Sequence, residues 1–118
     1  AERNKDKSVV IWGTGKASRE FLYVDDTAKA ILKVVTDFHD SGPLNLGTGI
    51  ETTIKDLVEL IRCKTNFNGE IIWDKNKPDG QPRRFYDMSL FRNELKYLPN
   101  TPLELGIEET VKWYKEHF

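Results

Sequence analysis

Cysteine, histidine, long apolar runs and an excess of one charge are all scarce in this sequence. Cys63 is the only cysteine and there are two histidines in 118 residues, so an internal disulfide and a cysteine metal cluster are excluded and no metal site is expected. A reducing, cytoplasmic setting is the default for such a composition. No apolar run approaches the roughly 20 residues that span a bilayer. A formal net charge of -1 argues against a polybasic surface for nucleic acid or membrane.

The length and the first residues bear on domain organisation. With 118 residues, 38% of them hydrophobic, the chain is expected to form one domain over residues 1–118 with a single core. Residues 1–7 are polar, lack an initiator methionine and precede an apolar run, which is typical of a helix end and a turn leading into a strand. We interpret the chain as a portion of a longer protein, although a processed small protein would begin in the same way.

Apolar periodicity predicts an α/β fold with few short strands and three or four helices. Runs of β-branched, aromatic and aliphatic residues predict strands over residues 9–12, 20–24, 44–47 and 70–73. Helical spacing predicts helices over residues 27–38, from 54 onward, from 87 or 89 to 97, and from 101 onward. We expect three capping side chains at helix starts, namely Asp25 or Asp26, Thr53 and Thr101.

Two glycine-rich turns have only a superficial likeness to phosphate-binding loops. The turn at residues 13–16 lacks the third glycine of a dinucleotide-binding fingerprint and is followed by a predicted strand rather than a helix. We interpret it as a hairpin turn. The turn at residues 47–49 either leads tightly into the next helix or offers its backbone to a ligand. The adjacent acids Asp25 and Asp26 are better explained by helix capping than by a metal pair, because no histidine or third carboxylate accompanies them.

Four side chains are candidates for binding, each with a simpler structural alternative. Arg19 presents planar donors that suit phosphate oxygens, or it forms an ordinary salt bridge. Trp12 stacks on a sugar or base, or it only packs. Asp79 accepts hydrogen bonds from a ribose or base, or it is a turn acid before glycine. Arg83 belongs to a stiff charged loop of the kind that often carries binding residues, and it could reach a diphosphate.

Three blocks of the sequence together resemble the extended short-chain dehydrogenase/reductase family, also called the NAD-dependent epimerase/dehydratase family. The blocks are Trp12 to Gly15 with Arg19 to Phe21 and Val24 to Asp26; Asn45 to Gly49 with Thr53 and Ile54; and Lys77 to Arg83 with Asp87, Leu98, Pro99 and Thr101 to Glu104. The Trp-Gly and Lys-Pro-Asp-Gly forms look most like family members that epimerise and then reduce a GDP-4-keto-6-deoxymannose with NADPH. The resemblance covers nearly the whole chain, from about residue 9 to the end.

The resemblance implies that the chain is the small C-terminal substrate-binding subdomain of such an enzyme, without its Rossmann core. Trp12, Arg19 and Asp79 would contact a nucleoside diphosphate-sugar, with Arg19 facing the diphosphate and Arg83 as a second cation. NADP or NAD would bind outside this chain, because the family's Gly-x-x-Gly-x-x-Gly loop does not occur here. Its Tyr-x-x-x-Lys pair is also missing, so no catalytic residue is assigned and the chain alone is expected to be inactive.

Several alternatives and partners remain open at this level. The substrate could instead be a UDP- or dTDP-sugar, or the chain could be a free-standing, non-catalytic binding module. The expected partners are the nucleotide-sugar and the missing N-terminal Rossmann part. A homodimer is a further partner to test, because a cut chain can associate through surface that its missing part would cover.

Overall fold

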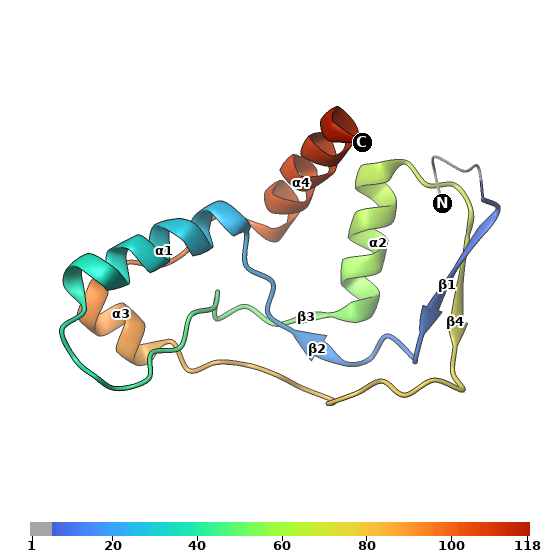
Figure 1. Ribbon diagram of the computed structural model, residues 1–118. Coiled ribbons are helices and arrows are strands. Elements are labelled where there is room, and N and C mark those ends of the chain that lie inside the picture. Colours follow the sequence, from blue (N-terminus) through green and yellow to red (C-terminus); the bar gives the residue numbers. More distant parts are fainter. Residues whose placement is uncertain (1–5) are drawn as a thin grey trace.

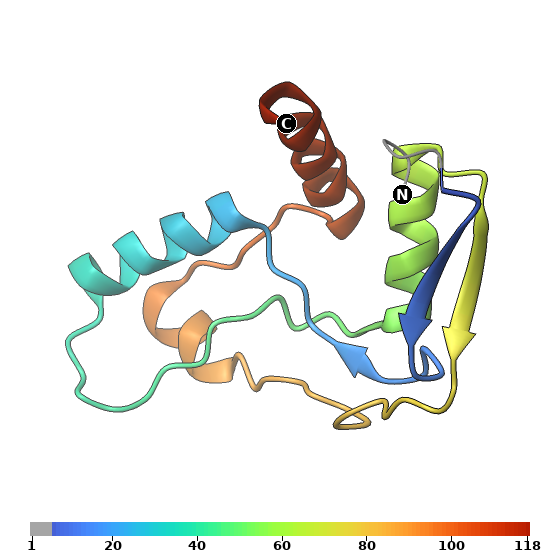
Figure 2. The ribbon, with the colours of Figure 1, turned by 45° about the vertical axis from the view of Figure 1, so that its right-hand side comes forward.

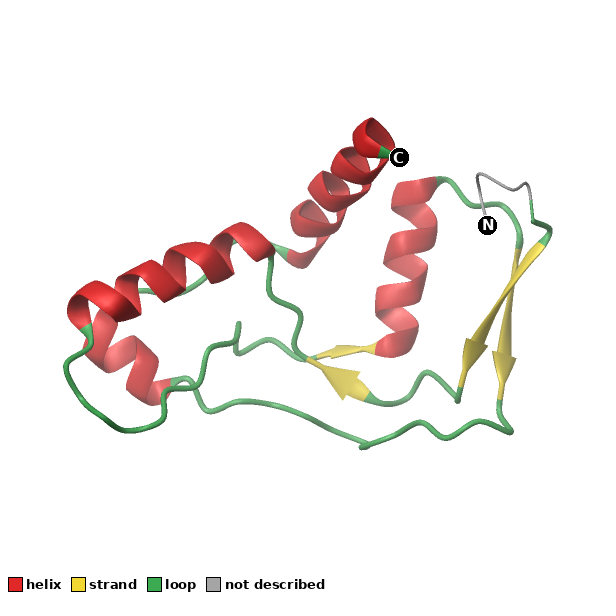
Figure 3. Ribbon diagram, viewed as in Figure 1, coloured by secondary structure: helices red, strands yellow, loops and turns green. Residues whose placement is uncertain are grey.

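The computed structural model describes residues 6–118, so residues 1–5 of the predicted N-terminal helix end lie outside the described residues. Along the chain the elements are β1 (Ser8–Trp12), β2 (Ser18–Arg19), α1 (Val24–Asp37), β3 (Thr52–Thr53), α2 (Ile54–Thr65), β4 (Glu70–Asp74), α3 (Ser89–Leu95) and α4 (Leu103–His117). Figure 1 and Figure 3 show these elements spread out, with long loops between them. The predicted α/β class with few short strands is confirmed.

The longest strands, β1 and β4, form a parallel pair in which Val9 stands opposite Ile71 and Ile11 opposite Trp73. These four side chains are half-buried, whereas Val10 and Trp12 on the other face are 57% and 67% exposed. This is the alternation expected of a strand with one covered face. Helix α2 lies beside the pair in both views (Figure 1, Figure 2). Trp12 therefore ends β1 on an open face.

The predicted hairpin between residues 9–12 and 20–24 is wrong. The short strand β2 pairs antiparallel with β3, not with β1, and a parallel bridge joins Ser18 to Arg83 on its other side. Residues 20–23 run as loop into α1, and residues 44–47, predicted as a strand, are also loop. The turn at Gly13 and Gly15 does have positive φ at both glycines, but it redirects the chain toward the loop after β4 instead of closing a hairpin.

The apolar core lies between α1 and α3. Its buried members are Ala30, Met88, Phe91 and Leu95, and partly buried side chains such as Val34 pack around them. The opposite face of α1 carries a second apolar stripe, in which Val24, Ile31, Leu32 and Val35 are 53–76% exposed. A helix that is apolar on two faces is suited to burial on both. Among residues 6–118, this face of α1 is thus left exposed.

The predicted cap is confirmed for α2 but wrong for α1 and α4. Thr53 accepts a hydrogen bond from the amide of Asp56 at 3.0 Å, as an N-cap should. Helix α1 begins earlier than predicted, after Tyr23, with no side-chain cap, and α4 begins after Pro102, also without one. Asp26 instead accepts the amides of Asn100 and Thr101, at 3.0 and 2.8 Å. It ties α1 to the segment that enters α4.

The chain is expanded for its length. Its radius of gyration is 17.0 Å, whereas a compact domain of this size has about 13.5 Å. Helix α4 rests on α2 through Lys64, which pairs with Glu104 and Glu108 at 2.9 and 2.8 Å, and Gly106 packs against the ring of Tyr23. Within residues 6–118, no helix is both long and apolar enough to cross a membrane. An open arrangement of this kind is what a portion of a larger fold would show.

Candidate functional site

The loop after β4 brings the predicted site residues together. Residues 77–84 run alongside residues 12–19, and the two segments touch at several points in succession. Lys77 lies over Trp12, Asp79 bonds to Thr14, and Gly80 lies beside the guanidinium of Arg19. Backbone bonds then join Ser18 to Pro82 and Arg84, at 3.0 and 3.2 Å. Trp12, Arg19 and Asp79, far apart in sequence, thus share one edge of the molecule.

Asp79 is fixed by the glycine-rich turn that follows β1. Its Oδ1 accepts the amide of Thr14 at 2.5 Å and its Oδ2 accepts the Thr14 hydroxyl at 2.6 Å. The hydroxyl bond from Thr14 is the main cause that lowers the pKa of Asp79, helped by the backbone amides and by nearby Lys16. Gly13 must be glycine here, because a Cβ would overlap Asp79 Oδ1. The carboxylate therefore stays charged and oriented.

Trp12 and Arg19 lie before and after Thr14, the residue that Asp79 binds, in the same segment. The Lys77 Nζ is 5.3 Å from the centroid of the Trp12 ring, a cation–π distance, and Trp12 is 67% exposed. The Arg19 Nη1 donates to the carbonyl of Ser18 at 2.6 Å. Within residues 6–118, no carboxylate forms an ion pair with Arg19, so the simple salt bridge considered for it is not formed. Most of its donors are available to a ligand.

Arg83 has its charge already matched. Its Nε and Nη2 both reach Glu51, with a shortest distance of 2.8 Å, and Ser18 donates its hydroxyl to the same carboxylate. The bonds from Arg83 are the main cause that lowers the pKa of Glu51, and the same pair raises the pKa of Arg83. A bidentate fork of this kind holds the guanidinium in one orientation. Of the two predicted cations, Arg19 is the better placed for an anionic ligand.

Glu20, next to Arg19 in the chain, has a structural role that the sequence analysis did not reveal. Its Oε2 accepts the amides of Thr48 and Gly49 at 2.7 and 2.8 Å, and its Oε1 accepts the amide of Tyr86 at 2.7 Å. A Cβ at Gly47 would overlap this carboxylate. Glu20 therefore ties three distant segments together directly beside Arg19. No local pattern marks it, because its partners are three backbone amides and the Thr48 hydroxyl, at 3.3 Å, all far from it in sequence.

Neither glycine-rich turn fits the phosphates of a dinucleotide cofactor. Such a site needs free amides pointing at the phosphate, usually at a helix N-terminus. Here the amide of Thr14 donates to Asp79, and the amides of Thr48 and Gly49 donate to Glu20. Both turns thus present carboxylates where a phosphate would sit. The ligand-contact alternative considered for residues 47–49 is not supported by this geometry.

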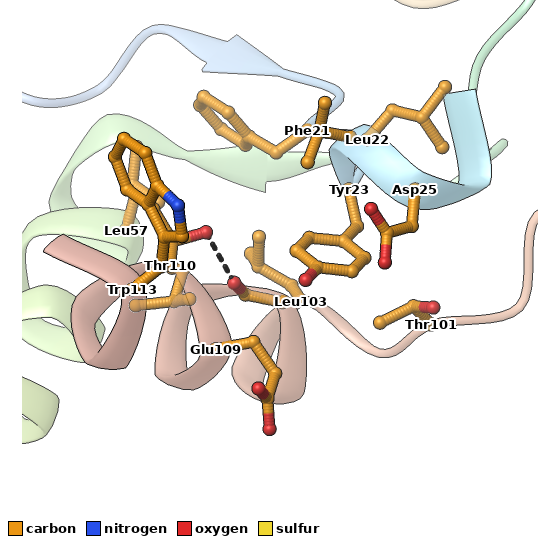
Figure 4. A pocket seen from close by; sticks show the side chains of 13 residues that line it. Phe21, Leu22, Tyr23, Asp25, Leu57, Thr101, Leu103, Glu109, Thr110 and Trp113 are labelled. Carbon is orange, nitrogen blue, oxygen red and sulfur yellow. Dashed lines mark hydrogen bonds between the residues drawn. The ribbon is translucent and has the colours of Figure 1, made fainter. Parts of the chain in front are cut away.

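A cavity formed by other residues lies elsewhere. It encloses about 600 Å³ between the start of α1, α2 and α4, and its walls are mostly apolar, including Phe21, Leu57 and Trp113. Figure 4 shows the side chains around it, with Asp25 and Glu109 as its acids. A pocket whose charged groups are acids repels phosphate. None of the four predicted site residues lines it, so it is not the candidate site.

Comparison with known proteins gives the same family. The model of the NAD dependent epimerase/dehydratase family matches residues 1–47. Probable GDP-L-fucose synthase 1 of Oryza sativa subsp. japonica is 42% identical over 117 residues, covering 99% of this chain and 35% of that protein. The crystal structure of a GDP-L-fucose synthetase from Naegleria fowleri bound to NADP superposes with a TM-score of 0.88 at 31% identity, covering 92% of this chain and 35% of that chain.

A UDP-glucose 4-epimerase from Thermotoga maritima, solved with UDP-glucose, is also similar, with a TM-score of 0.83 at 28% identity over 92% of this chain and 35% of that one. The chain thus spans about a third of the length of the relatives it matches. It belongs to the NAD-dependent epimerase/dehydratase family, the extended short-chain dehydrogenases/reductases, and corresponds to about a third of the length of such a protein. Of these three relatives, one is named a probable GDP-L-fucose synthase and one a GDP-L-fucose synthetase.

Proposed function

We propose that this chain is the nucleotide-sugar-binding C-terminal portion of an NADP- or NAD-dependent nucleotide-sugar epimerase/reductase of the GDP-L-fucose synthase kind. Its task is to hold the substrate for chemistry that other parts of the full-length enzyme perform. Support comes from the similarity over almost the whole chain and from the way one loop gathers Trp12, Arg19 and Asp79 at one edge. The substrate would be a GDP-linked keto-sugar.

The observation that carries the proposal is a local excess of positive charge. Residues 12–19 and 74–84 contain six lysines and arginines against two aspartates, a net charge of +4, in a chain whose net charge is -1. Glu51 pairs with Arg83 and lowers this excess to +3. Because the two segments lie side by side, their charges act on the same volume. Such a patch attracts a diphosphate and disfavours a neutral sugar.

Each residue of the site would contact a different part of the ligand. Arg19 would donate to the diphosphate, since its planar fork suits phosphate oxygens and no ion pair engages it in the described part of the chain. Trp12 offers an exposed ring for stacking on a sugar or base. Asp79, charged and oriented by Thr14, would accept hydrogen bonds from hydroxyl or base N–H groups. Arg83, held by Glu51, would add charge from the rim.

The partners proposed for the chain follow from its open shape. The apolar stripe of α1, with Val35 at 76% exposure, would be covered by the N-terminal Rossmann part of the full-length enzyme. That part would also supply the cofactor site, which the two glycine-rich turns here do not fit. Association of two copies of the isolated chain through the same stripe is the alternative when that part is missing.

A second candidate substrate is a UDP-sugar, because the Thermotoga maritima relative is named as a UDP-glucose 4-epimerase. Calorimetry of the full-length enzyme with GDP, UDP and dTDP separates the candidates, with GDP expected to bind most tightly. In the same assay Arg19→Ala should weaken GDP binding by about 1–3 kcal/mol, the value of a charge-assisted hydrogen bond. Arg92→Ala, on the exposed side of α3, is the control. Unchanged affinity in Arg19→Ala, with the fold intact, would remove Arg19 from the site.

A further inference from the structure

We propose that Glu20 is a positioning residue for Arg19, and that its carboxylate fixes the direction in which the Arg19 guanidinium faces a ligand. The inference rests on the proposed function, in which Arg19 contacts the diphosphate. It adds a residue that acts through Arg19 rather than on the ligand. The two residues are neighbours in the chain, at the point where strand β2 ends. The bonds that hold the backbone on either side of Arg19 therefore decide how firmly its side chain is oriented.

The backbone on the N-terminal side of Arg19 is held by strand bonds. Strand β2 consists of Ser18 and Arg19 alone and pairs with β3. On the other edge of β2, the Ser18 amide donates to the carbonyl of Pro82 at 3.0 Å, and the Ser18 carbonyl accepts the amide of Arg84 at 3.2 Å. Residues 20–23 are loop, so the strand bonds stop at Arg19 and the chain that follows must be held in another way.

The Glu20 carboxylate supplies hydrogen bonds at this point. Its Oε2 accepts the amides of Thr48 and Gly49 at 2.7 and 2.8 Å, and its Oε1 accepts the amide of Tyr86 at 2.7 Å. The two oxygens therefore bond to two different segments of the chain, which fixes the orientation of the carboxylate. Hydrogen bonds to a charged acceptor are stronger than neutral ones. The side chain of Glu20 thus takes over where the strand bonds end.

The contacts of the Arg19 side chain do not by themselves fix its direction. The guanidinium faces the loop after β4, where a Cβ on Gly80 would stand 3.8 Å from Nη2, and Nη1 donates to the carbonyl of Ser18 at 2.6 Å. Neither contact holds the backbone on the C-terminal side of Arg19. A rotation of the backbone at Glu20 would turn the guanidinium away from that loop. A planar fork binds phosphate oxygens well only when it is correctly oriented.

A purely structural role for Glu20 gives a different expectation. If Glu20 only holds the fold together, its loss should lower the melting temperature and should act on ligand affinity equally with and without Arg19. If Glu20 positions Arg19, its loss should weaken binding of a diphosphate and spare an uncharged nucleoside. The loss of affinity should also disappear once Arg19 is removed, because no guanidinium is left to position. A double-mutant cycle measures this dependence.

The test measures GDP and guanosine binding to the full-length enzyme by calorimetry in Glu20→Gln, Arg19→Ala, the double variant and the control Glu94→Gln. Glutamine keeps one acceptor oxygen but places an NH₂ donor against backbone amides. Glu94 is an exposed glutamate on α3. We expect Glu20→Gln to weaken GDP binding about three- to tenfold, a smaller loss than Arg19→Ala causes, with guanosine unchanged. In the Arg19→Ala background, the same substitution should change GDP binding by less than about twofold.

Three results would overturn the inference while leaving the proposed function intact. One is equal GDP affinity in Glu20→Gln and Glu94→Gln. Another is a parallel loss for GDP and guanosine in Glu20→Gln, and the third is the same loss of GDP affinity with and without Arg19. If Glu20→Gln does not fold, Glu20→Asp, which keeps the charge on a shorter side chain, takes its place in the cycle. Failure of the wild-type enzyme to bind GDP, UDP or dTDP would instead refute the proposed function, and the role of Glu20 with it.

Discussion

Asp26 is predicted to hold the entry of α4 against α1, and Asp26→Asn should release it. The carboxylate is only 2% exposed, and its Oδ2 accepts the amides of Asn100 and Thr101 at 3.0 and 2.8 Å. Burial by itself would raise the pKa of Asp26, but the backbone and side-chain bonds from Thr101 and the amide of Asn100 outweigh it, so the pKa is lowered. The asparagine variant keeps the shape and one acceptor oxygen but loses the charge.

The size of the effect follows from these two bonds. A hydrogen bond to a charged acceptor contributes about 1.5–3 kcal/mol and a neutral one about 0.5–1.5 kcal/mol, so each bond weakens by about 1 kcal/mol. The pair then loses about 2 kcal/mol, which corresponds to roughly 30-fold faster opening of the segment. Hydrogen exchange of the two amides of residues 100 and 101, measured at pH 7, reports this opening directly. Asp26→Ala, which has no acceptor, should exchange faster still.

The matched control is Asp25→Asn, since Asp25 is exposed and adjacent. Exchange in Asp26→Asn that is within threefold of both wild type and this control would refute the reasoning. The pH dependence gives a second check. Because the folded pKa of Asp26 lies below the unfolded value of about 3.9, its stabilising effect is fully present above that pH and is lost as the pH falls through the folded pKa. The difference between wild type and Asp26→Asn should therefore shrink below about pH 4.

Two further predictions concern the site and the chain as a whole. Gly47→Ala should destabilise the full-length enzyme by about 1–3 kcal/mol, the usual cost of overpacking, because the added Cβ would overlap Glu20 Oε2. The control is Gly42→Ala, where a Cβ would stand 3.8 Å from its nearest neighbour. Equal melting temperatures for the two variants would contradict the role given to Glu20. The chain of 118 residues alone should show no oxidoreductase turnover of a GDP-keto-sugar with NADPH, and measurable turnover would mean that these residues contain a catalytic site of their own.

The parts of the fold that could be predicted are those set by local chemistry. The turn residues Asn68 and Gly69 precede β4 as predicted, and Thr53 caps α2 because a side-chain oxygen three residues before a free amide is a local signal. The strand pairing could not be predicted in the same way. Residues 20–24 include aromatic and β-branched residues with strand propensity, but the Glu20 carboxylate accepts hydrogen bonds from the backbone amides of residues 48, 49 and 86. These partners are too far away in sequence for a local pattern to contain them.

The candidate site, too, could be predicted from the sequence only in part. Trp12, Arg19 and Asp79 were singled out by residue type and family resemblance, and the structure places them along one loop, which leaves their role in binding a prediction. What the sequence could not show is which charges are already matched. Arg83 and Arg19 look alike in sequence, yet Arg83 meets Glu51 in a bidentate pair and Arg19 does not. Such pairing depends on a register between residues 51 and 83 that only the folded chain defines.

Carboxylates rather than apolar contacts hold this site in shape. The buried apolar side chains lie mainly between α1 and α3, away from the loop that carries Asp79. Around the site, the Glu20 carboxylate accepts hydrogen bonds from two distant segments, and the Asp79 carboxylate accepts them from Thr14 in the glycine-rich turn. Glu51 bonds to both Ser18 and Arg83. Each of these bonds has a charged acceptor and so is stronger than a neutral bond. These hydrogen bonds fix the positions of the segments without an apolar core beneath them, which explains how so open a chain can have a defined surface at the candidate site. Because the pKa values of Asp79 and Glu51 are both lowered, acid should loosen these two ties as the pH falls through the lowered values.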